Sequence, residues 1–240
     1  MGIEQHFKNI VKSLEACSEK EFAKGMKAFF KEEINPIGVR RPALRKLVDD
    51  FFREHGENLP FADAIMLSEK LMKTGVFEHT DFALMLVDKY RDSYKKETFE
   101  LFEGWIDKYI TNWAHCDTLC PGPIGYMIFR HPELFPRVLH WTNSKNRWKR
   151  RAAAVSFVNI ARKSDYATEV TAVAERLLND NDDLVQKGTG WTLREAAKSN
   201  KRAIIAFLRK HKAVMPRTML RYAIERFNNR EKRELMEKAA

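Results

Sequence analysis

Apolar residues recur at spacings of three and four along almost the whole chain, and this period decides the fold class. The first stripe begins with Ile3, Phe7 and Ile10, and similar stripes continue past residue 150. Such spacing puts apolar side chains on one face of an α-helix, whereas a half-buried strand alternates at every second residue. That alternation is nearly absent, and only 10 Gly and 8 Pro are present for the tight turns of a sandwich or barrel. The sequence therefore predicts an all-α protein.

Helix start and stop signals divide the chain into short helices joined by short connectors. Ser18 and Glu21 have the spacing of a capping box before a second helix. Asn58-Leu59-Pro60 separates a third helix from a fourth, and Pro121-Gly122-Pro123 marks a later break. Connectors of this length are typical of antiparallel helix pairs.

A weak internal repeat relates two segments in the second half of the chain. The segments beginning at Asn146 and Asp183 lie 37 residues apart, close to the unit length of HEAT and armadillo arrays. Small residues at 152–154 and 188–190 would let stacked helices approach closely. We therefore expect residues 1–240 to form a single HEAT-like repeat domain, a solenoid with a continuous concave face.

The positive charge lies in one half of the sequence. The chain has a net charge of +10; residues 1–120 hold 18 Lys/Arg and 21 Asp/Glu, and residues 121–240 hold 25 and 12. A one-sided field favours a polyanionic partner, with nucleic acid ahead of an acidic membrane. We expect the concave face to be a basic DNA-binding groove; the alternative is a solvated surface that happens to be basic.

The sequence lacks the motifs of several common classes of nucleotide-binding, metal and catalytic site. There is no Walker loop, no GxGxxG after a strand, no HExxH and no GxSxG. The cysteines at 17, 116 and 120 have no zinc-ligand spacing, and no apolar run is long enough to span a membrane. We expect a cytoplasmic protein with reduced thiols, no metal, no cofactor and no membrane partner, and a repeat array of this size is expected to be monomeric.

The first segment that could carry chemistry contains Trp113 and Asp117. Four residues apart, they share one face if the segment is helical. An aromatic ring beside a carboxylate can stabilise a cation and orient water, which cleavage of a glycosidic bond through an oxocarbenium-like state requires. Spacing alone favours the structural alternative, a core Trp113 with Asp117 as a helix cap or salt-bridge partner.

Two further segments are rich in cations and aromatic rings. In residues 144–151, a run of Lys and Arg surrounds Trp148, and Ser144 or Asn146 could cap the helix that follows. A helix N-terminus with such cations is a phosphate site, although a solvated helix end explains the run equally well. In residues 186–195, Gly188 and Gly190 indicate close approach by a neighbouring helix or by a DNA backbone. Trp191 would stand in the groove or in the core.

These segments, in this order, resemble those of the AlkD family of bacterial DNA glycosylases. That family has a Trp-x-x-x-Asp element, an N-x-W-x-x-R-A-A element and a Q-K-x-x-G-W-x-L-R-E element, as this chain has from Trp113, Asn146 and Gln186. The stretch from Gly38 to Arg45 is similar to the family's early G-x-x-x-P-x-x-R stretch. The resemblance covers roughly residues 5–228.

The resemblance implies a HEAT-like solenoid that excises cationic N3- and N7-alkylated purines from double-stranded DNA. Family members act without a metal and without placing the flipped base in a pocket. The matching positions make Asp117 the catalytic carboxylate and make Trp113 and Trp191 the aromatic pair against the deoxyribose. Arg151 would bind phosphate near the lesion. The remaining residues expected to bind DNA are Arg147, Trp148, Lys149, Arg150, Lys187 and Arg194.

One position departs from the family pattern. Gly25 stands where the family has a tyrosine that lines the site, and Phe29 or Phe30 could substitute for it. Asn112 and Ala114 also differ from the more aromatic, acidic version of the motif. These departures keep a second hypothesis open, a non-catalytic HEAT-like binder of damaged or branched DNA. A protein–protein scaffold, the generic role of solenoids, is the third.

Overall fold

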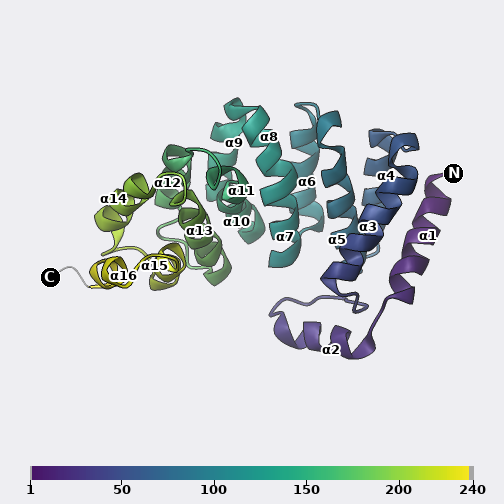
Figure 1. Ribbon diagram of the computed structural model, residues 1–240, viewed down its shortest axis with the longest axis horizontal. Coiled ribbons are helices and arrows are strands. Elements are labelled where there is room, and N and C mark those ends of the chain that lie inside the picture. Colours follow the sequence, from purple (N-terminus) through teal and green to yellow (C-terminus); the bar gives the residue numbers. More distant parts are fainter. Residues whose placement is uncertain (1, 238–240) are drawn as a thin grey trace. The chain divides into compact units, whose positions relative to one another are not determined.

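The structure, a computed structural model, describes residues 2–237, and every regular element in that range is a helix (Figure 1). No strand occurs in that range, so the prediction of an all-α protein is confirmed. One helix break falls where the sequence signals it: α3 (Arg41–His55) ends before Asn58, and α4 (Phe61–Met72) begins directly after Pro60. The break expected at Pro121-Gly122-Pro123 is wrong, because this segment stays helical as part of a π-helical turn, Cys120–Ile124. None of the helices in the described range is both long and apolar enough to cross a bilayer.

Contacts between residues divide the chain into two compact units. Unit 1 comprises Met1–Thr98 and Lys108–Leu119, and unit 2 comprises Phe99–Asp107 and Cys120–Ala240. The single repeat domain expected over residues 1–240 stays a prediction. The division also sharpens the charge asymmetry. Unit 1 holds 18 Lys/Arg and 18 Asp/Glu and is neutral, whereas unit 2 holds 25 and 15 and carries the whole net charge of +10.

Unit 1 is built from packed helices and one further helix, α2, that runs across their direction. Helix α5 packs against α3, α4 and α7, and α1 packs against α3 and α4. Helix α2 runs across the direction of α1, α3 and α5 instead of along it (Figure 1). The helices of this unit are α1 (Ile3–Ala16), α2 (Lys20–Phe29), α3, α4, α5 (Phe77–Val87) and α7 (Trp113–Leu119), with short 3₁₀ segments at Gly56–Asn58 and Asp88–Ser93.

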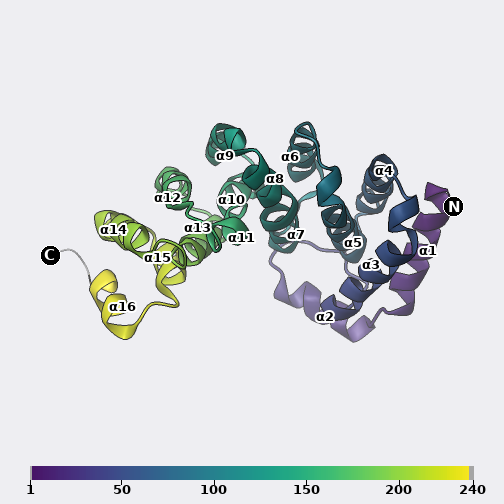
Figure 2. The same cartoon turned by 45° about the horizontal axis from the view of Figure 1, so that its top comes forward.

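Unit 2 is a two-layer helical stack. Helices α9, α12 and α14 lie side by side in one layer, and α10, α13 and α15 form the other (Figures 1 and 2). The unit contains residues 99–107 of α6 (Thr98–Tyr109), followed by a π-helical turn at Cys120–Ile124 and 3₁₀ segments at Pro132–Leu134 and Trp141–Asn143. Its further helices are α8 (Gly125–Arg130), α9 (Phe135–His140), α10 (Arg147–Val155), α11 (Val158–Ala161), α12 (Ala167–Arg176), α13 (Asp183–Ala196), α14 (Lys201–His211), α15 (Arg217–Ile224) and α16 (Asn229–Met236).

The internal repeat seen in the sequence corresponds to helices α10 and α13, which pack against each other. Each begins after a capping side chain: Asn146 accepts a hydrogen bond from the backbone N–H of Trp148, and Asp182 accepts from two backbone N–H groups of α13. A Cβ on Gly188 would lie 3.0 Å from Val155, and a Cβ on Gly190 would collide with the carbonyl of Met219 in α15. The two glycines therefore serve helix–helix packing.

The capping box expected at Ser18 and Glu21 is wrong. The Ser18 hydroxyl donates to the carbonyl of Glu15 at 2.7 Å, so it closes the end of α1 instead of opening α2. Helix α2 begins at Lys20 after Glu19, whose side chain makes no capping hydrogen bond. Ser18 lies next to both helix ends, and the carbonyl of the preceding turn is the partner within its reach.

A buried carboxylate organises the connection between α2 and α3. Glu78, at the start of α5 and 1% exposed, accepts hydrogen bonds from the backbone N–H groups of Ile37, Gly38 and Val39 at 2.7–3.1 Å. Gly38 has φ of +89°, and a Cβ there would collide with the carbonyl of Glu19. Only glycine satisfies both the backbone angle and the space, so Gly38 lets the loop between α2 and α3 pass close to Glu19 while Glu78 holds its backbone.

We expect Gly38→Ala to lower the free energy of unfolding by about 2 kcal/mol or more, because it combines left-handed backbone strain with a steric clash. The matched control is Gly25→Ala on α2, where an added Cβ meets no atom within 4 Å. That change should raise stability by about 0.5–1 kcal/mol, since alanine is the better helix former. Urea unfolding of the two variants measures both effects; equal midpoints would contradict this account of the loop.

Candidate functional site

The start of helix α7 is held by a buried network around His115. The side-chain oxygen of Asn112 caps the helix by accepting from the backbone N–H of His115 at 3.0 Å. Its amide nitrogen therefore donates to His115 Nδ1 at 2.8 Å, and His115 Nε2 donates to the carbonyl of Phe77 at 3.0 Å. This arrangement requires a neutral imidazole protonated on Nε2, and burial lowers the pKa of His115 accordingly. The network ties α7 to α5 and fixes the direction of the residues that follow.

Trp113 and Asp117 lie one turn apart on α7 and line one pocket of about 480 Å³ in unit 1. The Trp113 ring stacks on Phe30 with centroids 5.0 Å apart and planes 7° from parallel. Phe29 meets Trp113 edge-on at 6.1 Å. Trp113 and Asp117 are each half-buried, so the ring and the carboxyl group are accessible from the pocket. The structure thus brings together the two residues that the sequence paired by spacing.

A second polar group in the same pocket was not expected from the sequence. The side chain of Asp81 is 2% exposed, forms an ion pair with Arg41 and accepts from the hydroxyl of Thr118 at 3.0 Å. Arg41 also donates to Thr118 at 3.1 Å. Arg41 falls within the motif-bearing stretch at residues 38–45, but Asp81 and Thr118 carry no local signal. They meet only because α3, α5 and α7 pack together.

Arg151 lies between two helices of unit 2. The residue is 5% exposed, and its guanidinium donates to the carbonyl of Leu184 at the start of α13. A Cβ on Gly188 would come within 3.0 Å of the guanidinium nitrogen, so the absent side chain of glycine makes room for Arg151. The contact cross-links α10 to α13, the helix that carries Trp191. Trp191 itself is half-buried. It is therefore neither fully exposed in a groove nor fully buried in the core, the two positions that the sequence left open.

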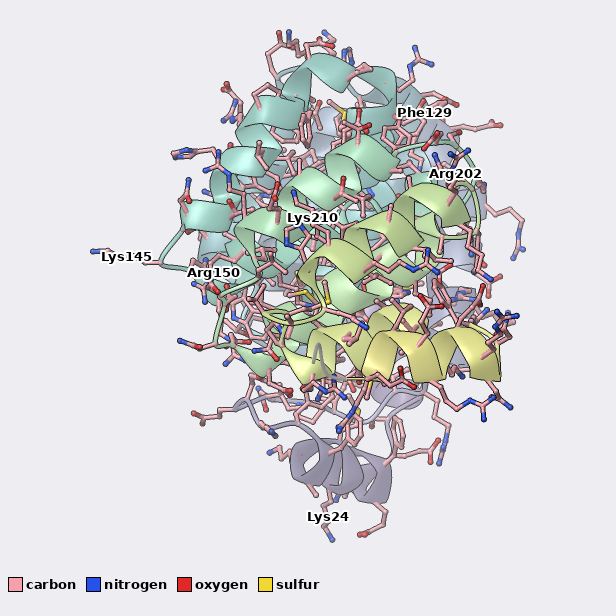
Figure 3. The ribbon with its side chains drawn as sticks, turned by 90° about the vertical axis from the view of Figure 1, so that its left-hand side faces the viewer. Lys24, Phe129, Lys145, Arg150, Arg202 and Lys210 are labelled. Atoms are coloured by element: carbon pink, nitrogen blue, oxygen red, sulfur yellow. The ribbon has the colours of Figure 1, made fainter. Side chains whose placement is uncertain are left out.

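The other cations expected to bind DNA each have an acidic partner in unit 2. Arg150 is the most constrained, because it also donates to the carbonyls of Ser144 and Lys145. Lys145 points outward from the same loop (Figure 3). A phosphate would therefore have to replace or share these carboxylates. The pairs are Arg147–Asp182 at 2.9 Å, Lys149–Asp107 at 2.7 Å, Arg150–Asp180 at 2.6 Å, Lys187–Asp183 at 2.7 Å and Arg194–Glu195 at 3.3 Å.

Trp148 has little surface left for DNA. It is 7% exposed, and the guanidinium of Arg147 lies 4.7 Å from its ring centroid. Its role as a DNA contact stays a prediction. Its burial shows that the ring also packs inside unit 2. Lys187 is better placed: it is partly exposed and lies four residues before Trp191 on α13, so the two share a face. A hydrogen bond with Asp183 raises the pKa of Lys187 and keeps it charged.

The expected site residues fall into both units. Trp113 and Asp117 belong to unit 1, whereas Arg151, Trp191 and the other cations belong to unit 2. The pairing of Trp113 with Trp191 around one deoxyribose stays a prediction. Within residues 2–237, no three His, Cys, Asp or Glu side chains are grouped so as to hold a metal ion.

Comparison with known proteins places the chain in a family. A family model described as "DNA alkylation repair enzyme" matches residues 10–227. The chain belongs to this family. A solved structure of a predicted DNA alkylation repair enzyme from Enterococcus faecalis has the same fold, with a TM-score of 0.76 over 88% of this chain and 97% of that one. The two sequences are 18% identical. No curated protein sequence matches the chain significantly.

The buried imidazole predicts how the stability of this family member depends on pH. Burial lowers the pKa of His115 below its ordinary value of 6.5, so the unfolded chain takes up the proton first as the pH falls. Stability is therefore fully present above the ordinary pKa and is lost as the pH falls from there toward the folded pKa. One such proton corresponds to a slope of about 1.4 kcal/mol per pH unit.

Because burial also lowers the pKa values of His6 and His79, the contribution of His115 must be isolated. We expect His115→Gln to be less stable than the wild type at neutral pH and to lose stability less steeply under mild acid. Chemical unfolding at a series of pH values measures the slope. Parallel profiles for the two proteins would show that His115 is not the buried neutral group described.

Proposed function

We propose that this DNA alkylation repair protein is a glycosylase that hydrolyses the N-glycosidic bond of N3- or N7-alkylated purines in duplex DNA. The observation that carries the proposal is the placement of Trp113 and Asp117 together on a half-open aromatic pocket. An alkylated purine of this kind is a cation, so it leaves as a neutral base. It needs little help from a general acid, and the demands on the protein fall on the sugar.

Asp117 is proposed to act on the deoxyribose. As the bond from C1′ to the base nitrogen breaks, its electron pair goes to the base and positive charge develops on the sugar. A carboxylate close to the sugar stabilises that charge, and the π face of Trp113 adds to it. Water then forms the new bond to C1′ and gives up a proton, which Asp117 can accept. The products are the free base and an abasic site.

Unit 2 is proposed to hold the DNA backbone. Its net charge of +10 supplies the attraction, and Lys187 and Trp191 lie on one face of α13. Arg147, Lys149 and Arg150 are proposed to exchange their carboxylate partners for phosphates. Double-stranded DNA with alkylated bases is the proposed partner, and the monomeric, cytoplasmic state expected from the sequence belongs to the same proposal.

A non-catalytic role in binding damaged or branched DNA is the second candidate. The observation that favours it is Gly25, which leaves open space on α2 at the position where the resemblance implies a tyrosine. Phe29 and Phe30 line the pocket beside Gly25 and supply aromatic surface there, which supports the catalytic alternative.

We expect Asp117→Asn to slow release of 7-methylguanine from methylated duplex DNA by about 100-fold or more, since a neutral amide no longer offsets charge on the sugar. Binding to the same duplex should change little. The control is Asp92→Asn, an exposed acid of unit 1 outside the pocket. Wild-type release no faster than that of Asp117→Asn, with binding intact, would favour the non-catalytic candidate.

Salt dependence separates a DNA-binding protein from a scaffold. Each phosphate contact adds about 0.9 to the slope of log K against log[salt]. Lys187→Gln should therefore reduce the slope by about that amount, whereas Lys24→Gln on the outer side of α2 should leave it unchanged (Figure 3). Fluorescence anisotropy of labelled duplex at several salt concentrations measures both. A nearly flat wild-type slope would support the scaffold.

A further inference from the structure

Two arginines at the end of helix α15 differ from the cations of α10 and α13, because they have no acidic partner. Arg221 lies in the last turn of α15, and Arg226 lies in the turn that follows the helix. Both side chains are exposed, and neither forms an ion pair or a hydrogen bond within residues 2–237. A phosphate can therefore reach these two guanidinium groups without displacing a carboxylate.

Helix α15 is amphipathic, and its exposed face holds an aromatic ring as well as the arginines. Exposed and buried residues alternate in pairs from residue 219 to residue 226, a spacing that puts the exposed side chains on one face of the helix. Tyr222 is 36% exposed and lies between the two arginines in the sequence. Its hydroxyl forms no hydrogen bond in the part of the chain that the structure describes. The buried side chains of α15 are Met219, Leu220, Ala223 and Ile224.

Tyr222 joins this face of α15 to the face of α13 that carries Lys187 and Trp191. A Cβ added to Gly190 would lie 2.5 Å from the Cβ of Tyr222, so the tyrosine packs on α13 beside the residue that precedes Trp191. A hydrogen bond with Asp183 is the main cause of the raised pKa of Lys187, and Tyr222 contributes to it. The phenol and the ammonium group are therefore neighbours, and the two helices present one continuous surface.

The chemistry of this surface suits the backbone of a nucleic acid. Glu225 is the only acid in residues 217–226, and it forms an ion pair with Arg194 of α13 instead of with Arg221 or Arg226. Guanidinium groups and a phenol hydroxyl both donate hydrogen bonds to phosphate oxygens. An acidic membrane would instead require several apolar side chains that enter the lipid, and the exposed face of α15 has none besides one tyrosine ring. The surface therefore favours duplex DNA as its partner.

We propose that the exposed face of α15 binds the phosphate backbone of duplex DNA, with Arg221 and Arg226 on phosphates and the Tyr222 hydroxyl donating to a phosphate between them. The inference rests on the proposed function for its choice of partner. Contacts with phosphates carry no information about the bases, so this face holds undamaged and alkylated DNA alike. It adds to the sequence-independent attraction that lets a protein move along DNA before it reaches a lesion.

Binding of the full chain to an unmethylated duplex tests the arginines, because it does not depend on base release. We expect Arg221→Gln and Arg226→Gln each to weaken binding by about fivefold and to reduce the slope of log K against log[salt] by about 0.9. The loss should be the same for a methylated duplex. The matched control is Arg202→Gln on α14, in the other helical layer, an exposed arginine that also has no ion pair within residues 2–237 (Figure 3). It should leave the slope unchanged in fluorescence anisotropy at several salt concentrations.

Tyr222→Phe separates the hydrogen bond from the charge. The change removes the hydroxyl and keeps the side chain that packs beside Gly190, so the fold is preserved. We expect binding to weaken by about three- to tenfold with no change in the salt slope, because a neutral donor releases no counterion. The control is Tyr166→Phe, the tyrosine that precedes α12 in the other layer of unit 2. That variant should bind duplex DNA as the wild type does.

The outcomes separate this inference from the proposed function. Lower salt slopes for the two arginine variants support the α15 surface even if the wild type releases no base from methylated DNA. Wild-type affinity and slope in both variants would overturn it and leave the glycosylase proposal standing. A loss confined to the methylated duplex would also overturn it, since the contact would then be with the lesion. So would variants that lose affinity for vesicles of phosphatidylserine and phosphatidylcholine but not for duplex DNA.

Discussion

The imidazole of His115, buried between α7 and α5, fixes the start of the helix that brings Trp113 and Asp117 to the pocket of unit 1. Both of its ring nitrogens are hydrogen bonded, one by the amide of Asn112 and the other to the carbonyl of Phe77. Asn112 at the same time caps α7, so the start of the helix and its attachment to α5 are set by one polar cluster. Trp113 and Asp117 follow directly on that helix. A shift of this cap would move both residues together.

Unit 2 depends on a different constraint, the close approach of neighbouring helices at glycine residues that have no side chain. Gly188 leaves space for the guanidinium of Arg151, and Gly190 lets the backbone of α15 approach α13. The helix that carries Lys187 and Trp191 is thus clamped on both sides by neighbours. Close packing of this kind gives a charged surface a rigid base, which lowers the entropy lost when a polyanion binds.

The electrostatics of unit 2 differ from a simple basic surface. Its net charge is +10, yet the cations of residues 147–151 are engaged with carboxylates or backbone carbonyls. The Arg150–Asp180 pair is largely buried, since the two side chains are 21% and 7% exposed, so a phosphate that takes the place of Asp180 leaves a buried carboxylate to be compensated. The pairs also hold these long side chains in fixed positions.

Much of the fold and part of the site were predictable from local pattern. Apolar spacing predicts the all-helical fold, and the match to a solved DNA alkylation repair fold agrees with it. The spacing of Trp113 and Asp117 predicts a shared helix face because the α-helical period is fixed by backbone geometry. The Ser18 capping box failed because that hydroxyl also reaches the carbonyl of Glu15, and sequence spacing does not rank the two partners.

The sequence by itself determined the helical fold, the shared face of Trp113 and Asp117, and the location of the charge excess, since each depends on residue type and spacing along one chain. Only the tertiary structure decided that Asp81 and Thr118 meet Arg41 and that α2 leaves Phe29 uncovered. It also decided that Gly188 and Gly190 face helices. These outcomes depend on contacts between residues about 30–80 positions apart, and such contacts arise from packing that no local period encodes.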